Sequence, residues 1–445
     1  MLKLKNKNLK SDSGGGLLSF KKYKEPHKKR KMIYFLSTLM ILSLGIFIFY
    51  KSYALYEEKK DFNVINGVVE DPGDIYYAYY VNNTITRYFP TKDSGLTLDT
   101  TKSSCTSGVT ISWDDDNWHA ILDYSNYQKN STTRTKCTLY FRKKPPLATT
   151  ILNNLVSGAN KSSTDVYTVP NKTSDSCTYT LAYDGTSDNN LRYVGKNPCN
   201  YVTFNGEKAG WRIIGILNTP EGQRMKLIST YPVEHLPWDV NDWTKSSLQT
   251  LLNSGAYYNR TTGKYYDGKD LDFTDDGFAY GLTGTAKNQI DTITWKLGGT
   301  TFEDSYSNGL ASHWYTCERG TTVYTGSSTE WQGKVGLMYP SDYGYATSGG
   351  TSMNRASCLA KELYNWSGAS DCYNNDWLYN SDTQWTLTPY SSSNGEVVAI
   401  DQDGSASENL GHIMNSLAVR PSVYLISKTS ILGGEGTREN PYEIG

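Results

Sequence analysis

Seven cysteines are the residues of this 445-residue chain whose spacing says most about chemistry. None forms a CxxC pair, which argues against a zinc ribbon and against thioredoxin-like redox chemistry. We expect neighbouring cysteines to pair, leaving Cys317 over, and each closed loop to contribute roughly 3 kcal/mol in the chain-entropy model. Because connectivity does not follow from sequence, buried free thiols stay an alternative. The expected disulfides are Cys105–Cys137, Cys177–Cys199 and Cys358–Cys372.

Residues suited to hydrolytic or metal chemistry are scattered. The histidines after residue 50 are widely separated and form no HExxH or HxH arrangement, so no zinc site on a helix is expected. His313, beside Trp314, is interpreted as a half-buried residue satisfied by a backbone group. Glu318 and Asp342 could form a glycosidase carboxylate pair, but nothing in the sequence fixes their separation. The sequence therefore predicts no catalytic residue, no metal site and no cofactor.

Two acidic stretches begin like calcium-binding loops. Asp114, Asp115 and Asp116 lie between two tryptophans, and residues 401–404 read Asp-Gln-Asp-Gly. The second stretch lacks the glutamate that a calcium loop carries at its twelfth position, and the first is enclosed by Trp113 and Trp118. Both are interpreted as hairpin turns.

Aromatic and polar residues crowd residues 314–385. Flat rings beside hydrogen-bonding groups suit a carbohydrate or peptide contact surface, because they supply area at low entropic cost. The alternative is that most of these rings fill space beneath long loops, and we favour that interpretation for the majority. If a contact face exists, the expected ligand-binding residues are Trp331, Asp342, Tyr343 and Tyr345.

These residues must be positioned by one domain over residues 176–445. Two apolar runs, 210–217 and 225–229, flank a Pro-Glu-Gly-Gln turn and predict a hairpin, the first strand buried on both faces. A helix is predicted over 243–253, with Thr244 as its N-cap, and a weaker one over 286–293. Residues 255–375 look dominated by loops. Strands are expected to return at 385–388, 396–400 and 418–425.

The region before this domain has a different pattern. β-rich runs separated by turn residues predict a small Ig-like β-sandwich over residues 51–145. Its expected strands include 75–81, 109–113 and 137–141. A basic run and a Pro-Pro pair end it, and residues 146–175 are expected to be a linker of low hydrophobicity that contains a helix.

The N-terminal end carries a membrane signal. Residues 32–50 contain no charge and are long enough for a transmembrane helix. Residues 1–31 carry eleven Lys and Arg against two acidic residues, so this tail is expected to stay cytoplasmic. We favour a retained signal anchor over cleavage after Ala54. The rest of the chain, with 33 basic and 43 acidic residues, would lie outside the cell with a net charge of −10. That charge argues against nucleic acid as a partner.

The order of the C-terminal motifs is specific. It runs WRIIGIL, KLIS, a WxxSxLxxLLN helix, KVGLMYPSDYGYA, a WxL strand, a DG hairpin, VRPSVYL and GGEGTRENPYEI. Over residues 180–445 this order resembles a family of Gram-positive bacterial surface proteins whose C-terminal domain has no established function. That domain is similar to the C-type-lectin-like fold shared with formylglycine-generating enzymes. The resemblance implies a fold and a surface location, but no activity.

Two departures from those relatives limit what can be transferred. Formylglycine-generating enzymes use a cysteine pair near the end of the domain, and the last cysteine here is Cys372. The Glu-Pro-Asn or Gln-Pro-Asp triplets of calcium-dependent lectins are also missing from the late loops.

The overall expectation is an α+β protein with an N-terminal transmembrane helix, a β-sandwich spacer and a C-type-lectin-like domain. It would be a cell-membrane protein with extracellular domains that binds a glycan, cell-wall polymer or protein without catalysis. The first alternative is an extracytoplasmic enzyme acting on cell-wall or glycan material. The second is a structural surface component without a discrete ligand.

Overall fold

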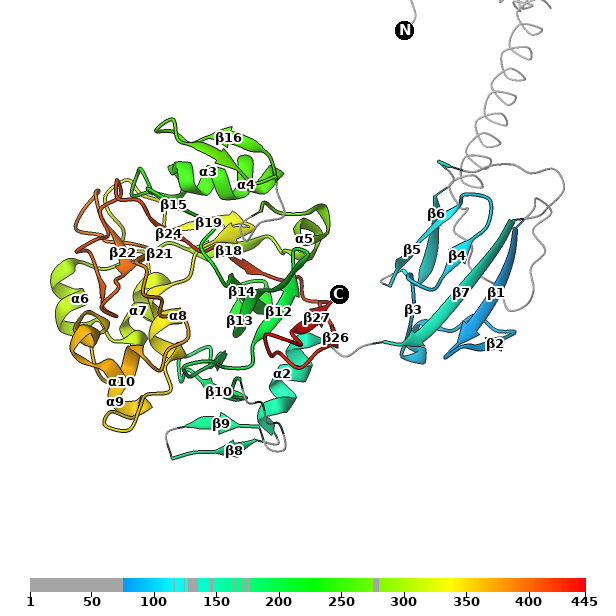
Figure 1. Cartoon of the computed structure of the whole chain (residues 1–445), viewed down its shortest axis with the longest axis horizontal. Coiled ribbons are helices and arrows are strands. Elements are labelled where there is room, and N and C mark those ends of the chain that lie inside the picture. The colour runs from blue at the N-terminus through cyan, green and yellow to red at the C-terminus, as the bar shows by residue number, and fades with distance from the viewer. Residues whose placement is uncertain are drawn as a thin grey trace, which may run out of the picture. The chain divides into compact units, whose positions relative to one another are not determined.

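The computed structural model describes residues 75–445, except for residues 116, 124, 127–134, 145, 146, 158, 164, 170, 171, 173, 175 and 275–279. The chain divides into two compact units, Met1–Lys144 and Pro145–Gly445 (Figure 1). Each unit has its own core and is described by itself.

The first unit is built from short strands around a five-stranded sheet of order β2-β1-β7-β3, with β4 also pairing with β7. β1 and β7 run parallel, and β5 and β6 form a separate antiparallel hairpin. The sequence predictions of strands at 75–81, 109–113 and 137–141 are confirmed within a few residues. The strands are β1 (Ile75–Val81), β2 (Thr84–Thr86), β3 (Leu96–Leu98), β4 (Ser104–Cys105), β5 (Thr110–Asp114), β6 (His119–Asp123) and β7 (Thr135–Lys143).

Alternation along β7 explains the core of this unit. Leu139 and Phe141 point inward and pack with Tyr79 and Leu98. Tyr140, which lies between them in the strand, is more exposed. Asp114 ends β5 opposite His119 of β6, so the acidic stretch after Trp113 begins at the closed end of a hairpin. That arrangement confirms the hairpin interpretation.

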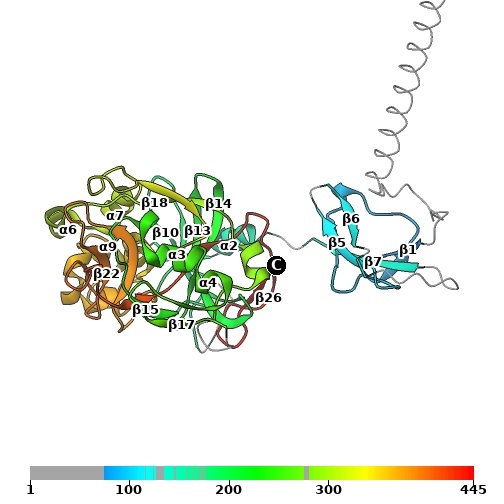
Figure 2. The same cartoon turned by 90° about the horizontal axis from the view of Figure 1, so that it is seen from above.

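The second unit contains two larger sheets. One has eleven strands, with the path β20-β25-β14-β13-β11-β10-β9-β8, and the other has five, in the order β15-β24-β21-β22-β23. Two further antiparallel ribbons, β16–β17 and β18–β19, stand outside these sheets. Figures 1 and 2 show the short helices α6, α7 and α9 gathered on one flank of the unit, away from α4 and the β16–β17 ribbon.

The strands of the second unit are β8 (Asn160–Lys161), β9 (Val166–Thr168), β10 (Thr180–Tyr183), β11 (Leu191–Tyr193), β12 (Tyr201–Phe204), β13 (Glu207–Thr219), β14 (Gly222–Ser229), β15 (Glu234–Leu236), β16 (Thr262–Lys264), β17 (Asp270–Asp272), β18 (Ile293–Lys296), β19 (Glu330–Gly333), β20 (Val335–Gly336), β21 (Gln384–Pro389), β22 (Val397–Ile400), β23 (Ala406–Ser407), β24 (Leu417–Val419), β25 (Ser422–Tyr424), β26 (Ile431–Gly433) and β27 (Tyr442–Ile444).

Its α-helices are α2 (Ala148–Ser157), α3 (Ser247–Asn253), α4 (Ala256–Asn259), α5 (Gly284–Gln289), α6 (Phe302–Asn308), α7 (Ala311–Glu318), α8 (Pro340–Ala346), α9 (Arg355–Leu359) and α10 (Ser370–Tyr373).

The central hairpin follows the sequence prediction. β13 and β14 pair antiparallel across the turn at Pro220 and Glu221, and β13 is buried along Trp211 to Leu217 on both faces. Gly215 sits where a side chain would meet the carbonyl of Leu191, 2.1 Å from the position of a Cβ. The uninterrupted apolar run is therefore the signature of a strand covered on both sides.

The predicted helix over 243–253 begins later than expected. Residues 243–245 form a short 3₁₀ turn, and α3 starts at Ser247. The N-cap is Ser246, whose hydroxyl accepts a hydrogen bond from the backbone N–H of Gln249, rather than Thr244. Ser246 can act as the cap because its backbone is extended directly before the first turn of α3. The weaker helix, predicted over 286–293, is α5 and ends at Gln289. Residues from Ile293 onward belong to strand β18.

The predicted strand over 418–425 is two strands. β24 pairs with β15 and β21 of the five-stranded sheet, whereas β25 pairs with β14 and β20 of the large sheet. Pro421 stands between them and cannot donate to either ladder. One continuous β-rich sequence thus joins the two sheets.

Residues 255–375, expected to be loops, contain α4 to α10 and β16 to β20. These elements are only two to eight residues long, too short to show a reliable apolar period. Residues 146–175, expected as a helix-containing linker, do include a helix, α2, together with the strands β8 and β9. The strands extend the large sheet, and α2 buries Ala148, Leu152 and Val156 in the domain core.

The expected fold class is corrected. Strand outweighs helix, at 36% against 20%, and no helix in the described part of the chain is long and apolar enough to cross a membrane. The longest, α2, has ten residues and so covers about 15 Å, half the thickness of a bilayer core. The described part of the chain is mainly β rather than α+β. Residues 1–31 and 32–50, on which the tail and span were expected, lie outside the described residues.

Three disulfides join the neighbours that the sequence pairs. They are Cys105–Cys137 between β4 and β7, Cys177–Cys199 before β10 and β12, and Cys358–Cys372 between α9 and α10. Cys317, on α7, is a free thiol. The last disulfide clamps the long segment between α8 and β21.

Candidate functional site

Three of the four expected ligand-binding residues lie on α8 and face inward. Asp342, Tyr343 and Tyr345 are all buried. The hydroxyl of Tyr343 donates to the carbonyl of Gly404, 2.8 Å away, and the ring of Tyr345 lies against the guanidinium of Arg192. A buried side chain cannot form a contact face, so these residues belong to the core. The sequence showed their crowding but not their orientation.

Trp331, the fourth expected contact residue, lies on a different element. It is half-buried on β19, opposite Trp295 of β18, with its ring 6.1 Å from that of Trp243. It is the only one of the four with accessible area.

Asp342 is the centre of a buried ion cluster, made of Asp184, Arg192, Lys226 and Asp342. Its two carboxylate oxygens lie 2.6 Å from Arg192 Nη1 and 2.5 Å from Lys226 Nζ. The second oxygen also accepts the backbone N–H of Tyr339, and Asp184 accepts from Arg192 Nε at 3.0 Å. Burial alone would raise the pKa of Asp342, but the attraction of Lys226 and Arg192 holds it well below its ordinary value.

The same cluster shows what burial does to Lys226. Its ammonium is fully buried, and this loss of hydration lowers the pKa despite the adjacent carboxylate. Its charge also lies near the rings of Tyr339 and Tyr424, at 4.5 and 5.2 Å from their centroids. The carboxylate and the rings together occupy the space around this cation. The buried ion cluster therefore links the large sheet to α8.

Glu318, the possible partner of Asp342 in glycoside hydrolysis, is also buried and engaged. It accepts the backbone N–H and the hydroxyl of Ser341, at 2.8 and 2.5 Å, and pairs with Arg319 at 3.0 Å. Burial raises its pKa to about 7. Because the hydrogen-bonding oxygens of both carboxylates are enclosed, the pair presents nothing to a substrate. The structure gives hydrolysis at this pair no support.

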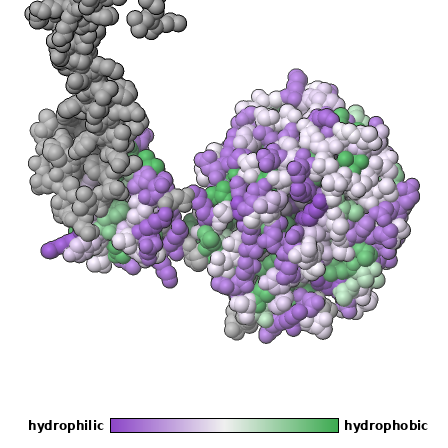
Figure 3. All heavy atoms as spheres, turned by 180° about the vertical axis from the view of Figure 1, so that it is seen from behind, coloured by the Kyte–Doolittle hydropathy of each residue, from purple (hydrophilic) through white to green (hydrophobic). Residues whose placement is uncertain are grey.

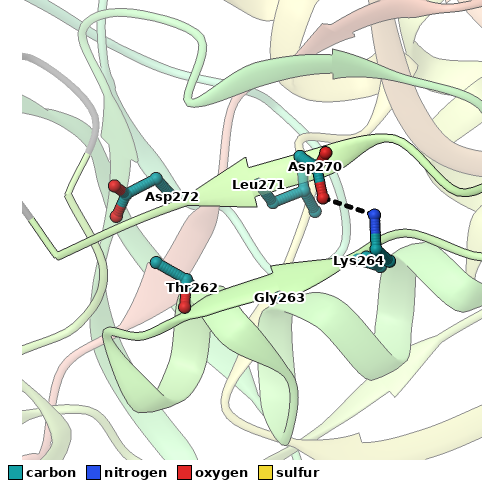
Figure 4. Close-up of a pocket in the computed structure, with 6 residues that line it drawn as sticks. All are labelled: Thr262, Gly263, Lys264, Asp270, Leu271 and Asp272. Carbon is teal, nitrogen blue, oxygen red and sulfur yellow. Dashed lines mark hydrogen bonds and ion pairs between the residues drawn. The ribbon is translucent and has the colours of Figure 1, made fainter.

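A hollow of about 510 Å³ lies on the β16–β17 ribbon. Thr262 pairs with Asp272 and Lys264 with Asp270, so their side chains share the outer face, whereas Leu271 is buried beneath. Figure 4 shows Lys264 joined to Asp270 at one end of the ribbon and Thr262 beside Asp272 at the other. The Lys264–Asp270 distance is 2.6 Å. This surface therefore offers hydroxyl, ammonium and carboxylate groups in one row.

A second hollow, of about 260 Å³, continues from the ribbon over the ends of α3 and α4. Tyr266 borders it and is 45% exposed, with its hydroxyl 3.7 Å from the sulfur of Met414. Tyr265 turns the other way, buries its ring and donates to the carbonyl of Pro237. We call the two hollows together the ribbon groove.

Sequence reasoning missed the ribbon groove. The available signal was the Asp267-Gly268 pair, a hairpin-forming turn with Gly268 at φ +92°, placed directly after two tyrosines. The strands on either side have three residues each, too few for alternation to be recognised.

Apolar surface elsewhere is scattered. On the face drawn in Figure 3 the second unit is mostly hydrophilic or neutral, with apolar residues in small separate patches. Singly exposed apolar residues are normal on a protein surface, so none of these patches identifies a site.

The interpretation of His313 is corrected. Its Nε2 lies 2.5 Å from a carboxylate oxygen of Asp304 and 3.3 Å from the sulfur of Cys317, so side chains rather than a backbone group satisfy it. The available signal was the spacing of His313 and Cys317, which places both on one face of a helix.

Comparisons with known proteins add nothing to this geometry. No protein-family model, curated protein or solved structure matches the chain.

Proposed function

We propose that this is an exported, non-catalytic recognition protein that binds a neutral glycan in the ribbon groove. The observation that carries the proposal is the groove itself. It is an accessible row of hydroxyl, ammonium and carboxylate groups bordered by the half-exposed ring of Tyr266.

The chemistry of the groove fits a sugar. Sugar hydroxyls both donate and accept, so a ligand of this class can bond to Asp270, Lys264 and Thr262 at the same time. A tyrosine ring offers the apolar face of a sugar a flat surface while its hydroxyl stays solvated. The acidic excess after residue 31 disfavours an anionic polymer.

The three disulfides support an extracytoplasmic location. Disulfides persist in oxidising compartments and are rare in a reducing cytosol. The motif order of residues 180–445, which resembles Gram-positive surface proteins, supports the same location and a role at the cell surface. A recognition protein working there would meet glycan and cell-wall polymers directly.

Binding of the full chain to neutral oligosaccharides and isolated peptidoglycan tests the proposal. We expect saturable binding to at least one of them, measured by calorimetry after an array screen. Tyr266→Ala and Asp270→Asn should each weaken it at least 10-fold. Both residues are exposed, so neither change should unfold the domain.

The β18–β19 ribbon provides the matched control. It carries a cross-strand Lys296–Glu330 pair at 2.6 Å, like that of the ribbon groove, and also holds Trp331. Glu330→Gln should leave binding unchanged. If Trp331→Ala abolishes binding while Tyr266→Ala does not, the ligand sits on the other ribbon. If no glycan binds saturably, the proposed function is wrong.

A further inference from the structure

Three potential metal ligands of different chemical type converge on the flank formed by α6 and α7. They are the carboxylate of Asp304, the imidazole of His313 and the thiol of Cys317, whose ligand atoms all lie within 4.8 Å of one another. The sequence gives no hint of Asp304 in this role. Figures 1 and 2 place α6 and α7 on a flank of the unit distant from the ribbon groove, so the two sites are separate.

Local structure explains the convergence. His313 and Cys317 are four residues apart on α7 and therefore project from the same helix face. Asp304 stands in the first turn of α6, which Thr301 caps by accepting its backbone N–H. A close turn at Gly309 connects the helices, and a Cβ there would lie 2.1 Å from the carbonyl oxygen of Ser305. Glycine thus lets the chain turn sharply out of α6, directly before α7 begins at Ala311.

The contacts do not form a nucleophile–base–acid relay. Such a relay uses the two ring nitrogens of histidine separately, one toward the nucleophile and the other toward the acid. Here the sulfur of Cys317 and the oxygen of Asp304 both approach Nε2 of His313, at 3.3 and 2.5 Å. One nitrogen cannot direct its single proton or lone pair at both partners, whereas a cation between the three atoms would bind all of them.

We propose that Asp304, His313 and Cys317 bind a zinc-class divalent cation, with a fourth position open to solvent. Tetrahedral zinc with ordinary bond lengths holds its nitrogen and sulfur ligands about 3.5 Å apart and its nitrogen and oxygen ligands about 3.3 Å apart. The sulfur–nitrogen distance of 3.3 Å already lies near that value, whereas the oxygen–nitrogen distance of 2.5 Å must lengthen when the ion binds. Binding releases the thiol proton to solvent.

Neighbouring side chains hold the carboxylate for this role. The hydroxyl of Thr300 donates to one oxygen of Asp304, and Asn308 Nδ2 donates to the other at 2.9 Å. Hydrogen bonds of this kind orient metal ligands in proteins, and each carboxylate oxygen keeps a further lone pair. The side chains of Asp304 and His313 are 34% and 30% exposed, so an ion can reach them from solvent.

Titration of the full chain, with its disulfides intact, by Co²⁺ tests the site. We expect one equivalent of Co²⁺ to bind with a sulfur-to-cobalt charge-transfer absorption in the near ultraviolet, and Zn²⁺ to displace it. Cys317→Ser should abolish that absorption. His313→Ala and Asp304→Ala should each weaken Co²⁺ binding at least 10-fold. Zn²⁺ should also slow alkylation of Cys317 by iodoacetamide at least 10-fold.

His235 and Asp382 provide a matched control. They form an exposed His–Asp pair at 2.6 Å that has no thiol beside it. His235→Ala should leave the cobalt stoichiometry and absorption unchanged. The proposal is overturned if cobalt absorption survives Cys317→Ser, if His235→Ala removes it, or if Zn²⁺ leaves alkylation unaffected. It is also overturned if Cys317 is found in an intermolecular disulfide. None of these outcomes bears on glycan binding in the ribbon groove.

Discussion

The buried ion cluster and the Asp304–His313–Cys317 group bring titratable side chains together in opposite ways. In the first, the ion-paired atoms of Asp342 are fully buried and already bonded to Arg192 and Lys226. In the second, a carboxylate, an imidazole and a thiol meet at one point that solvent reaches. A closed cluster can only stabilise the fold, because an incoming group has no access to it. An open one keeps the capacity to bind.

The largest expected effect comes from breaking the closed cluster. Asp342→Asn leaves the buried ammonium of Lys226 without its carboxylate partner, and leaves Arg192 with Asp184 as its remaining carboxylate. We expect the free energy of unfolding to fall by about 3–5 kcal/mol in urea denaturation. Asp382→Asn, which touches only the exposed pair with His235, is the control. A loss below about 1 kcal/mol would mean that the cluster is not structural.

The pH dependence of stability tests a buried carboxylate outside the ion cluster, that of Glu318. Burial raises the pKa of Glu318 from 4.5 to about 7, so the native state holds its proton more tightly than the unfolded chain does. The free energy of unfolding should therefore fall as pH rises from about 4.5 to about 7.

Glu318→Gln should remove on the order of 3 kcal/mol of that fall, as seen by urea denaturation at several pH values. Burial also raises the pKa of Asp401 to about 6 and of Glu207 to about 7, so part of the fall should remain in the variant. An unchanged pH profile would show that the pKa of Glu318 is the same in the folded and the unfolded chain.

A substitution in the Asp304–His313–Cys317 group should lower the free energy of unfolding much less. Asp304→Asn removes a charge that is partly exposed and is shared among hydrogen bonds from Thr300, Asn308 and His313. We expect a loss below about 1 kcal/mol in the free energy of unfolding without added metal. A loss as large as that of Asp342→Asn would erase the distinction between the two regions.

The smallest effect is expected in the ribbon groove. Lys264 and Asp270 are both well exposed, and exposed ion pairs contribute little to stability. Asp270→Asn should leave the urea midpoint unchanged within error while weakening glycan binding. A shift of the midpoint would indicate that the groove is part of the structural framework.

Local sequence patterns were sufficient for several elements. The apolar runs around Pro220 predicted the β13–β14 hairpin, and the spacing of cysteines predicted which neighbours join. Both inferences concern residues close along the chain, where turn chemistry and short loop closure dominate. The strand predicted over 418–425 was found as one element, but its division between two sheets at Pro421 required the topology.

The candidate sites were harder to predict because chemical type does not report burial. Asp342 and Tyr343 have the composition of a contact surface, yet α8 lies inside the unit and buries both. His313 and Cys317 carry a helical spacing, but a third ligand from α6 makes the group significant.

The sequence by itself determined the local turns, the strand-rich character of the chain and the neighbouring cysteines available for disulfides. Only the tertiary structure decided which charges are closed in and which stay accessible. Arg192 and Asp342 are 150 residues apart, and Lys226 and Asp342 are 116 apart. Periodicity acts over a few residues, whereas these partners meet only because two strands of one sheet pass beneath α8.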